Sequence, residues 1–266
     1  VGKQTGIEHP ITITVPSSYQ PTSHKLQKPS DPQTRQQRYP VIYLLHGFGD
    51  NHSGWSSSVD MAKLANQFNV IIVNPDGNNN SWYLNSPVNS KARYEDYIAV
   101  DVVNYIDDNF NTIAQRKGRA ITGLSMGGFG ALNIALNNQH TFGAVGAMSA
   151  GVDLRPFLSS FDIEKVLGPY TDYPKRWTQV AIIENLHKLA AGNNQWRTTP
   201  DYLPMMIDIG VDDFFLTQNR KLHHALLALN IRHEYIERPG GHNWQYWQNA
   251  IEYQMLFLTR SLSRAH

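Results

Sequence analysis

The stretch that most constrains the fold covers residues 120–136 and contains the turn Gly-Leu-Ser-Met-Gly. It starts with an apolar, β-branched run at 120–122, which predicts a short buried strand. Beyond the turn, the apolar residues 131–136 predict a helix. A strand, a Gly-x-Ser-x-Gly turn and a helix in this order form the pattern called a nucleophile elbow. The pattern therefore predicts an α/β protein that holds Ser125 at the carboxyl end of a strand.

The two glycines of this turn have a physical reason. A serine in so sharp a turn has a strained backbone, and a β-carbon at either flanking position would collide with the neighbouring chain. The turn also directs the first free N–H groups of the helix toward the space above Ser125, where they favour negative charge. Because Gly-rich turns also occur where nothing reacts, the role of Ser125 depends on partners elsewhere in the chain.

Composition limits the classes of chemistry and of partner. The 266 residues are 41% hydrophobic and 17% charged, which is ordinary for a globular protein and fits one α/β domain spanning 1–266. A net charge of +1 gives no argument for nucleic acid or an anionic membrane as partner. With no cysteine, the chain excludes disulfides, thiolate metal sites and a thiol nucleophile. No apolar run approaches the ~20 residues of a membrane span.

Composition leaves the oligomeric state and the compartment open. The chain starts at Val1, without a charged-then-apolar leader. Two interpretations follow: a secreted or periplasmic protein whose signal has been removed, or a trimmed cytoplasmic chain.

Strand and helix patterns alternate along the chain, which predicts a mostly parallel central sheet with helices on both faces. The predicted strands are 11–15, 39–45, 69–74, the elbow strand, 143–149, 205–210 and 233–237. The predicted helices are 59–68, 94–110, the elbow helix, 180–191, 214–229 and 244–262. The polar stretch 16–38 is expected to be a surface loop. The aromatic, proline-punctuated stretch 151–199, with Trp196 near its end, is expected to be a small cap-like insertion near the active site.

A serine needs a base to take its proton, and histidine has a suitable pKa near neutral pH. Among the eleven histidines, His242 stands out because it follows the last predicted strand in a Gly-Gly-His loop. The glycines allow this loop to approach the turn around Ser125 closely. The third member of the site should be a carboxylate that orients the imidazole. The loop after strand 205–210 offers Asp212 and Asp213, and Asp208 inside that strand is a weaker rival.

The resulting chain order, Ser then Asp then His, is that of the α/β hydrolases. Such a site needs two N–H donors for an oxyanion. The backbone of Met126, directly after the serine, is the first candidate. The second is the backbone of Phe48, in the loop after strand 39–45. His46, in the same loop, suits a supporting role near the oxyanion or the substrate.

Several motifs together resemble the esterase D-like family of α/β hydrolases, which includes feruloyl esterases, tributyrin esterases, S-formylglutathione hydrolases and mycolyl transferases. The similarity runs from about residue 39 to the C-terminus. It rests on Tyr-Pro-Val-Ile-Tyr-Leu-Leu-His-Gly at 39–47, Ser-Trp-Tyr at 81–83, Gly-Leu-Ser-Met-Gly-Gly-Phe-Gly-Ala at 123–131, Ala-Met-Ser at 147–149, Gly-Val-Asp-Asp at 210–213 and Gly-Gly-His-Asn-Trp at 240–244. In the family the acid stands three residues after the glycine that ends its strand, which implies Asp213 here.

Two departures narrow the resemblance to the feruloyl and tributyrin esterase branch. The S-formylglutathione hydrolases have a cysteine in the oxyanion loop, and this chain has none. The mycolyl transferases use glutamate as the acid, where this chain has Asp213.

The resemblance implies a serine carboxylesterase that works through an acyl-enzyme, without metal or cofactor, on feruloyl or acetyl esters of carbohydrates. Trp82 is expected either to line the substrate pocket or to be a packing residue. Acyl transfer to a sugar or another alcohol is the alternative, and an inactive binding module is a further one.

Overall fold

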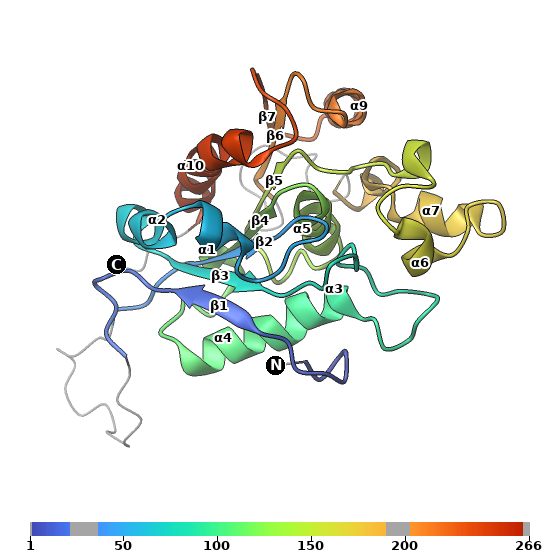
Figure 1. The fold of residues 1–266 in the computed structure, drawn as a ribbon. Helices are drawn as coiled ribbons and strands as arrows, with labels where there is room; N and C mark the ends of the chain where they lie inside the picture. The colour runs from blue at the N-terminus through green and yellow to red at the C-terminus, as the bar shows by residue number, and fades with distance from the viewer. Residues whose placement is uncertain (1, 22–36, 190–202, 263–266) are drawn as a thin grey trace.

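The computed structural model describes residues 2–21, 37–189 and 203–262. Its centre is a seven-stranded sheet with the strand order β1-β3-β2-β4-β5-β6-β7 (Figure 1). The neighbouring strands run parallel except β1, which pairs antiparallel with β3. The strands are β1 (Ile11–Thr14), β2 (Val41–Leu45), β3 (Ile71–Pro75), β4 (Arg119–Gly123), β5 (Ala144–Met148), β6 (Met205–Gly210) and β7 (Glu234–Arg238). The predicted α/β hydrolase architecture is thereby confirmed.

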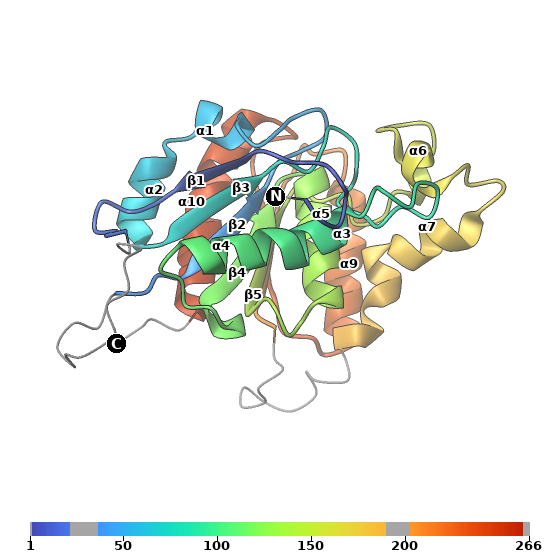
Figure 2. The same ribbon diagram turned by 90° about the horizontal axis from the view of Figure 1, so that it is seen from below.

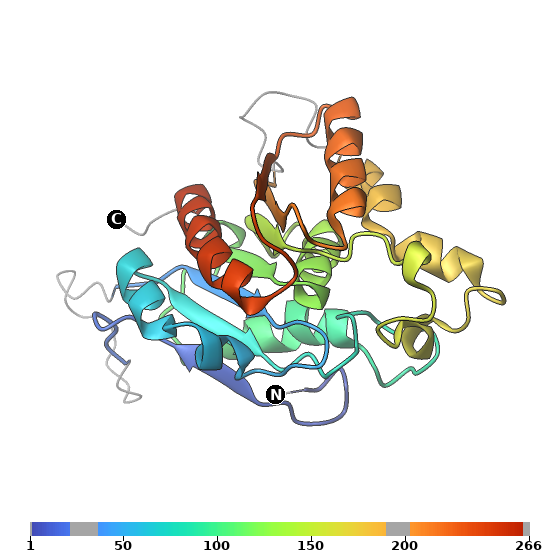
Figure 3. The ribbon, with the colours of Figure 1, turned by 45° about the horizontal axis from the view of Figure 1, so that its top comes forward.

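Helices cover both faces of the sheet (Figures 1 and 2). One face carries α1 (Gly54–Ser58), α2 (Met61–Phe68) and α10 (Trp244–Ser261). The other carries α3 (Tyr94–Asp96), α4 (Val103–Asn109), α5 (Met126–Asn137) and α9 (Leu216–Ala228), with a π-helical stretch at Tyr97–Val102 joining α3 to α4. Figure 3 shows α9 and α10 on opposite sides of β6 and β7.

The central strands are apolar without interruption because both of their faces are covered. In β2, Ile42 and Leu44 pack among the side chains of α2 and α10, whereas Tyr43 and Leu45 belong to the core on the opposite face. Every residue of β2 is fully buried. The prediction of a strand buried on both faces is thus confirmed for β2.

The strand order places two loops of the chain side by side. The chain builds β2, moves outward to β3 and then returns to place β4 on the other side of β2. Leu45 and Gly123, the last residues of β2 and β4, are partners in the parallel register. Loops that follow the carboxyl ends of strands at such a point of reversal commonly form binding sites. The loop after Leu45 and the turn around Ser125 therefore share one edge of the sheet.

The segment between β5 and β6 is where the sequence prediction is least accurate. It contains two short helices, α6 (Ile163–Leu167) and α7 (Pro174–Val180), which lie to one side of the sheet in Figure 1. The predicted helix 180–191 is wrong in the middle of its described part, where a 3₁₀ turn covers Ile182–Asn185, while residues 187–189 are α-helical. Ala181 is extended and the Ile182 N–H donates to the Val152 carbonyl, a bond that interrupts helical pairing. Residues 190–199, including Trp196, lie outside the described residues.

The helix α1 was not predicted, because a Gly-Trp-Ser-Ser-Ser sequence carries no helical apolar period; its Trp55 is buried and donates its Nε1–H to the Leu45 carbonyl at 3.0 Å. Most of the predicted loop 16–38 lies outside the described residues. Within the described ranges, no helix is long and apolar enough to cross a bilayer.

Candidate active site

Ser125 lies between β4 and α5 in a strained conformation, with φ 54° and ψ −115°. Such values are costly for a residue with a β-carbon and persist only where the surroundings enforce them. Here a β-carbon on Gly123 would lie 2.6 Å from the Gly127 carbonyl carbon, and one on Gly127 would lie 2.5 Å from the Leu45 carbonyl oxygen. The Ser125 N–H also donates to the Met148 carbonyl on β5. Close backbone packing therefore fixes the turn and holds the serine hydroxyl above the sheet.

Three side chains from three loops form one hydrogen-bonded row. Ser125 Oγ lies 2.9 Å from His242 Nε2, and His242 Nδ1 lies 2.9 Å from Asp213 Oδ2. An ionised carboxylate can only accept, so Nδ1 carries the proton and Nε2 is free to accept from the serine hydroxyl. The structure thus brings together the serine, the histidine and one of the two acids that the sequence pointed to.

The two other aspartates do not reach His242. Asp212 is exposed, and its backbone N–H donates to the Gly240 carbonyl. Asp208 is fully buried; Arg238 Nη2 donates to its Oδ2 at 2.6 Å and Tyr246 donates to its Oδ1. Burial raises the pKa of the Asp208 carboxyl, against the lowering effects of these two donors. Asp208 therefore belongs to a buried ion pair beneath the site.

Asp213 is held on both of its carboxylate oxygens. Its Oδ1 accepts the Phe215 N–H at 2.8 Å, while Oδ2 faces His242. The loop that carries Asp213 lies close to the loop that carries His242, because a β-carbon on Gly210 would lie 2.1 Å from the Gly240 carbonyl oxygen. The two loops are thus packed backbone to backbone, which fixes the distance between Asp213 and His242.

Three aromatic rings surround the His242 imidazole. The ring centroids of Phe214, Trp247 and Phe215 lie 4.3, 5.0 and 5.5 Å from it. These rings limit the rotation of the imidazole. No motif of the sequence pointed to this aromatic enclosure. The available signal was the placement of aromatic residues within one to five positions of Asp213 and His242.

The expected N–H donors flank the serine. Met126 is the first residue of α5, and a β-carbon on Gly47, directly before Phe48, would lie 3.6 Å from Ser125 Cβ. Neither the Phe48 N–H nor the Met126 N–H donates to an acceptor among the described residues. Two backbone donors are therefore available beside Ser125.

His46 and Trp82 lie behind the site. His46 is 1% exposed and sits beneath the loop 47–49. Trp82 is also 1% exposed and donates its Nε1–H to the Phe161 carbonyl at 3.0 Å. Phe161 has a positive φ of 60°, so Trp82 stabilises a strained neighbour. Neither His46 nor Trp82 lines the cavity, whereas Phe48 and Phe161 do.

A cavity of about 690 Å³ opens beside the serine. Its aromatic lining comprises Phe48, Phe161, Phe214, Trp244 and Trp247. Its polar lining comprises Asp50, Asn51, Ser53, Ser57, Ser58 and His242. The cavity thus combines flat apolar surfaces with a group of hydrogen-bonding side chains, and it reaches His242, the hydrogen-bond partner of Ser125.

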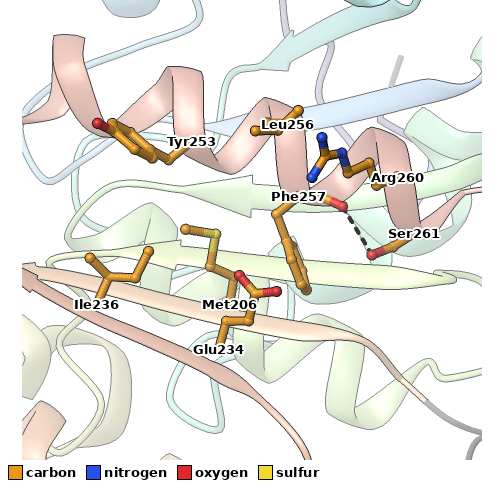
Figure 4. Close-up of a pocket in the computed structure, with 8 residues that line it drawn as sticks. All are labelled: Met206, Glu234, Ile236, Tyr253, Leu256, Phe257, Arg260 and Ser261. Carbon is orange, nitrogen blue, oxygen red and sulfur yellow. Dashed lines mark hydrogen bonds between the residues drawn. The ribbon is translucent and has the colours of Figure 1, made fainter.

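Another cavity, of about 220 Å³, lies between α10 and the strands β6 and β7 (Figure 4). Met206 and Glu234, which line this cavity, are near the beginning of their strands. The cavity therefore opens at the amino ends of the strands, opposite to the carboxyl ends where Ser125 lies. Within the ranges that the structure describes, no three His, Cys, Asp or Glu residues gather in a way that could hold a metal ion.

A mostly parallel sheet with a strained serine at the end of one strand, and an aspartate and a histidine after later strands, defines the α/β hydrolase class. The chain belongs to the family described as putative esterase, whose model matches residues 17–258. The resemblance drawn from the motifs is confirmed, and the chain is an enzyme of the carboxylic ester hydrolase class.

Individual relatives agree with this assignment. An acetyl esterase from Caldicellulosiruptor saccharolyticus is 26% identical over 223 residues, covering 79% of this chain and 80% of that protein. The esterase Rv1288 from Mycobacterium tuberculosis is 31% identical over 240 residues; the match covers 80% of this chain but only 51% of that protein. The structure of the fluorophosphonate-binding serine hydrolase F from Staphylococcus aureus superposes with a TM-score of 0.79 at 21% identity, covering 97% of this chain and 95% of that one. At this identity the likeness supports the fold.

Proposed function

We propose that the chain is a serine carboxylesterase that hydrolyses esters through an acyl-enzyme, with Ser125 as nucleophile, His242 as base and Asp213 as orienting acid. The observation that carries the proposal is the hydrogen-bonded row from Ser125 Oγ through the imidazole to the buried carboxylate. An isolated serine hydroxyl is a poor nucleophile, and such a row supplies the base that removes its proton during attack.

In the first half of the reaction, Ser125 Oγ attacks the ester carbonyl carbon and His242 Nε2 takes the hydroxyl proton. The carbonyl oxygen becomes an oxyanion, which the N–H groups of Phe48 and Met126 stabilise. The tetrahedral intermediate then collapses, the carbon–oxygen bond to the alcohol breaks, and His242 donates its proton to the departing alcohol. The acyl group remains on Ser125.

In the second half, water takes the place of the alcohol. His242 removes a proton from the attacking water, and the same two N–H groups hold the second oxyanion. Collapse releases the carboxylic acid and returns the proton to Ser125 Oγ. Asp213 stays ionised throughout and stabilises the imidazolium that forms twice in each turnover.

For the substrate, we infer an acetyl or feruloyl ester of a carbohydrate. Aromatic side chains such as Trp244 provide flat surfaces on which a sugar or a phenolic ring can pack, while Asp50, Asn51 and Ser57 offer partners for hydroxyl groups. The acetyl esterase among the relatives supports a short acyl group, and the aromatic wall supports an aromatic one.

A panel of esters tests this assignment. Rates on 4-nitrophenyl acetate, methyl ferulate and acetylated xylan would rank the acyl and alcohol preferences, with Ser125→Ala as the matched inactive control. Turnover of the carbohydrate ester at a higher kcat/KM than 4-nitrophenyl acetate is the expected result. Hydrolysis restricted to 4-nitrophenyl acetate would contradict the carbohydrate assignment while leaving the esterase mechanism in place.

Acyl transfer is the second candidate, because an alcohol bound by the polar side chains of the cavity could attack the acyl-enzyme in place of water. Product analysis with an added sugar or glycerol acceptor separates the two reactions. A transferred ester that forms faster than free acid would identify a transferase. Failure to label with a fluorophosphonate probe would instead point to an inactive binding module.

A further inference from the structure

His46 has an unusual position between the end of β2 and the loop 47–49. Its imidazole is buried, and each of its ring nitrogens has a backbone partner. Nδ1 lies 2.8 Å from the carbonyl oxygen of Gly47, the next residue in the chain. The N–H of Gly77, from the loop after β3, points at Nε2 at 2.9 Å.

These two contacts fix the tautomer of His46. The Gly77 N–H can only donate, so Nε2 accepts and carries no proton. The Gly47 carbonyl can only accept, so Nδ1 carries the proton and donates. Burial lowers the pKa of His46, although the Gly47 carbonyl and the carboxylates of Asp76 and Asp50 oppose this effect. The neutral imidazole that the arrangement requires is thus the form that burial favours.

The bond to Gly47 also determines where the next N–H points. A trans peptide unit is planar, and its C=O and N–H groups point in opposite directions. The described residues contain no cis peptide bond. Holding the Gly47 carbonyl toward His46 therefore turns the Phe48 N–H away from His46. Gly47 itself contacts the nucleophile turn, because a β-carbon there would lie 2.5 Å from Leu124 Cδ1 and 3.6 Å from Ser125 Cβ.

We propose that His46 is a positioning residue that sets the direction of the Phe48 N–H toward the oxyanion formed at Ser125. The inference rests on the proposed function, since it assigns His46 to the oxyanion hole of that reaction. His46 does not line the cavity, so its effect on the substrate passes through the Gly47–Phe48 peptide.

The loop 76–83 holds this arrangement from the outside. Besides the Gly77 N–H, it provides the Tyr83 hydroxyl, which donates to the His46 carbonyl at 3.1 Å. The Asn79 carbonyl accepts the Gly49 N–H at 2.7 Å. The segment 46–49 is thus bound at three points by one neighbouring loop, so the peptide is oriented before substrate arrives, as an effective oxyanion site requires.

Two substitutions separate the bonds of the imidazole. In His46→Asn the amide nitrogen occupies roughly the place of Nδ1 and can still donate to Gly47. In His46→Gln the amide oxygen can reach the Gly77 N–H, but the Gly47 carbonyl loses the imidazole donor and keeps only the longer bond from the Asp50 N–H, at 3.3 Å. With 4-nitrophenyl acetate, we expect His46→Gln to lower kcat by about 10²- to 10³-fold, the usual cost of one oxyanion donor, with little change in KM. We expect His46→Asn to lose less than about tenfold.

A tetrahedral adduct gives a readout that a merely structural role would not change. A trifluoromethyl ketone adds to the serine hydroxyl and forms an oxyanion there. In His46→Gln, the inhibition constant of this ketone should rise by about the same factor by which kcat/KM falls. The affinity for the product acid should stay unchanged. Equal losses of kcat in the two variants, or wild-type kcat in His46→Gln, would overturn the inference.

Tyr83→Phe serves as the test if both His46 variants fail to fold. It keeps the buried ring and removes only the donor to the His46 carbonyl, so kcat should fall roughly two- to tenfold at constant KM; unchanged kcat would count against the inference. Ser125→Ala distinguishes the two levels of the proposal. Full turnover in Ser125→Ala would refute the proposed mechanism itself, whereas an inactive Ser125→Ala beside a fully active His46→Gln would refute only the role of His46.

Discussion

His242 Nε2 lies 2.9 Å from Ser125 Oγ, although 117 positions separate the two residues in the chain. The contact depends on the strand order, because β4 and β7 are three strands apart and the short loop 239–243 after β7 carries the imidazole to the serine. Packing between the loops that follow β6 and β7 therefore decides whether the hydrogen-bonded row of Ser125, His242 and Asp213 forms.

Removing the hydroxyl of Ser125 should abolish nearly all turnover. Ser125→Ala is expected to lower kcat by about 10⁶-fold, since the members of such a row act as one unit. The measurement is the steady-state rate on 4-nitrophenyl acetate, together with labelling by a fluorophosphonate. A thermal unfolding curve equal to that of the wild type shows that the loss is chemical. Near-native hydrolysis by Ser125→Ala would end the assignment.

The two adjacent aspartates allow a matched comparison. Asp213→Asn should lower kcat by about 10⁴-fold, because an amide in place of the carboxylate favours the wrong imidazole tautomer. Asp212→Asn changes an exposed side chain and should stay within about twofold of wild type, as surface substitutions usually do. Kinetic constants for both variants at one pH decide the matter. A larger loss at position 212 would show that the acid has been misassigned.

His46 should make folding sensitive to acid. Its pKa in the folded protein is lowered by burial from an ordinary value of 6.5, so the unfolded chain binds the proton more readily. The contribution of neutral His46 is fully present above pH 6.5 and is lost as the pH falls below this value toward the folded pKa.

Urea unfolding between pH 5 and 8 measures this effect. His46→Gln should flatten part of the acid-side slope of unfolding free energy, while His187→Gln, at an exposed position, should leave the slope unchanged. Identical slopes for wild type and His46→Gln would contradict the expectation.

The buried ion pair of Asp208 and Arg238 should matter more for stability than an exposed one. Arg238→Met leaves a fully buried carboxylate without its cation, and such losses cost about 3–5 kcal/mol of unfolding free energy. Arg220→Met breaks the more exposed pair with Glu237 and should cost under about 1 kcal/mol. Adding Asp208→Asn to Arg238→Met should restore part of the loss. Denaturant unfolding of these variants checks the ranking, and equal costs for the two arginines would contradict it.

Much of the fold follows from local sequence patterns. The run around β2 is apolar because the strand is buried on both faces, and β6 ends where the predicted strand ends. The glycines at 123 and 127 indicated the turn because their close backbone contacts tolerate no side chain. Ser125, Asp213 and His242 could be listed from motifs and chain order, although their catalytic roles stay predictions.

What local patterns missed depends on contacts distant in sequence. The break after α7 is caused by a hydrogen bond from Ile182 to Val152, which no helical period reveals. The choice between Asp212 and Asp213 follows from which side chain the loop buries, and only the family resemblance favoured the second. The placement of Trp82 behind Phe161 likewise comes from tertiary packing.

None of the residues that line the larger cavity belongs to a strand of the central sheet. Ser57 and Ser58 lie on α1, and Phe161 belongs to the stretch between β5 and β6. Exchanging these side chains therefore leaves the backbone that fixes Ser125 intact. Positions 57, 58 and 161 are therefore suitable for a small mutant library in laboratory evolution. Substitutions there can change which leaving group the enzyme prefers while catalytic power is retained.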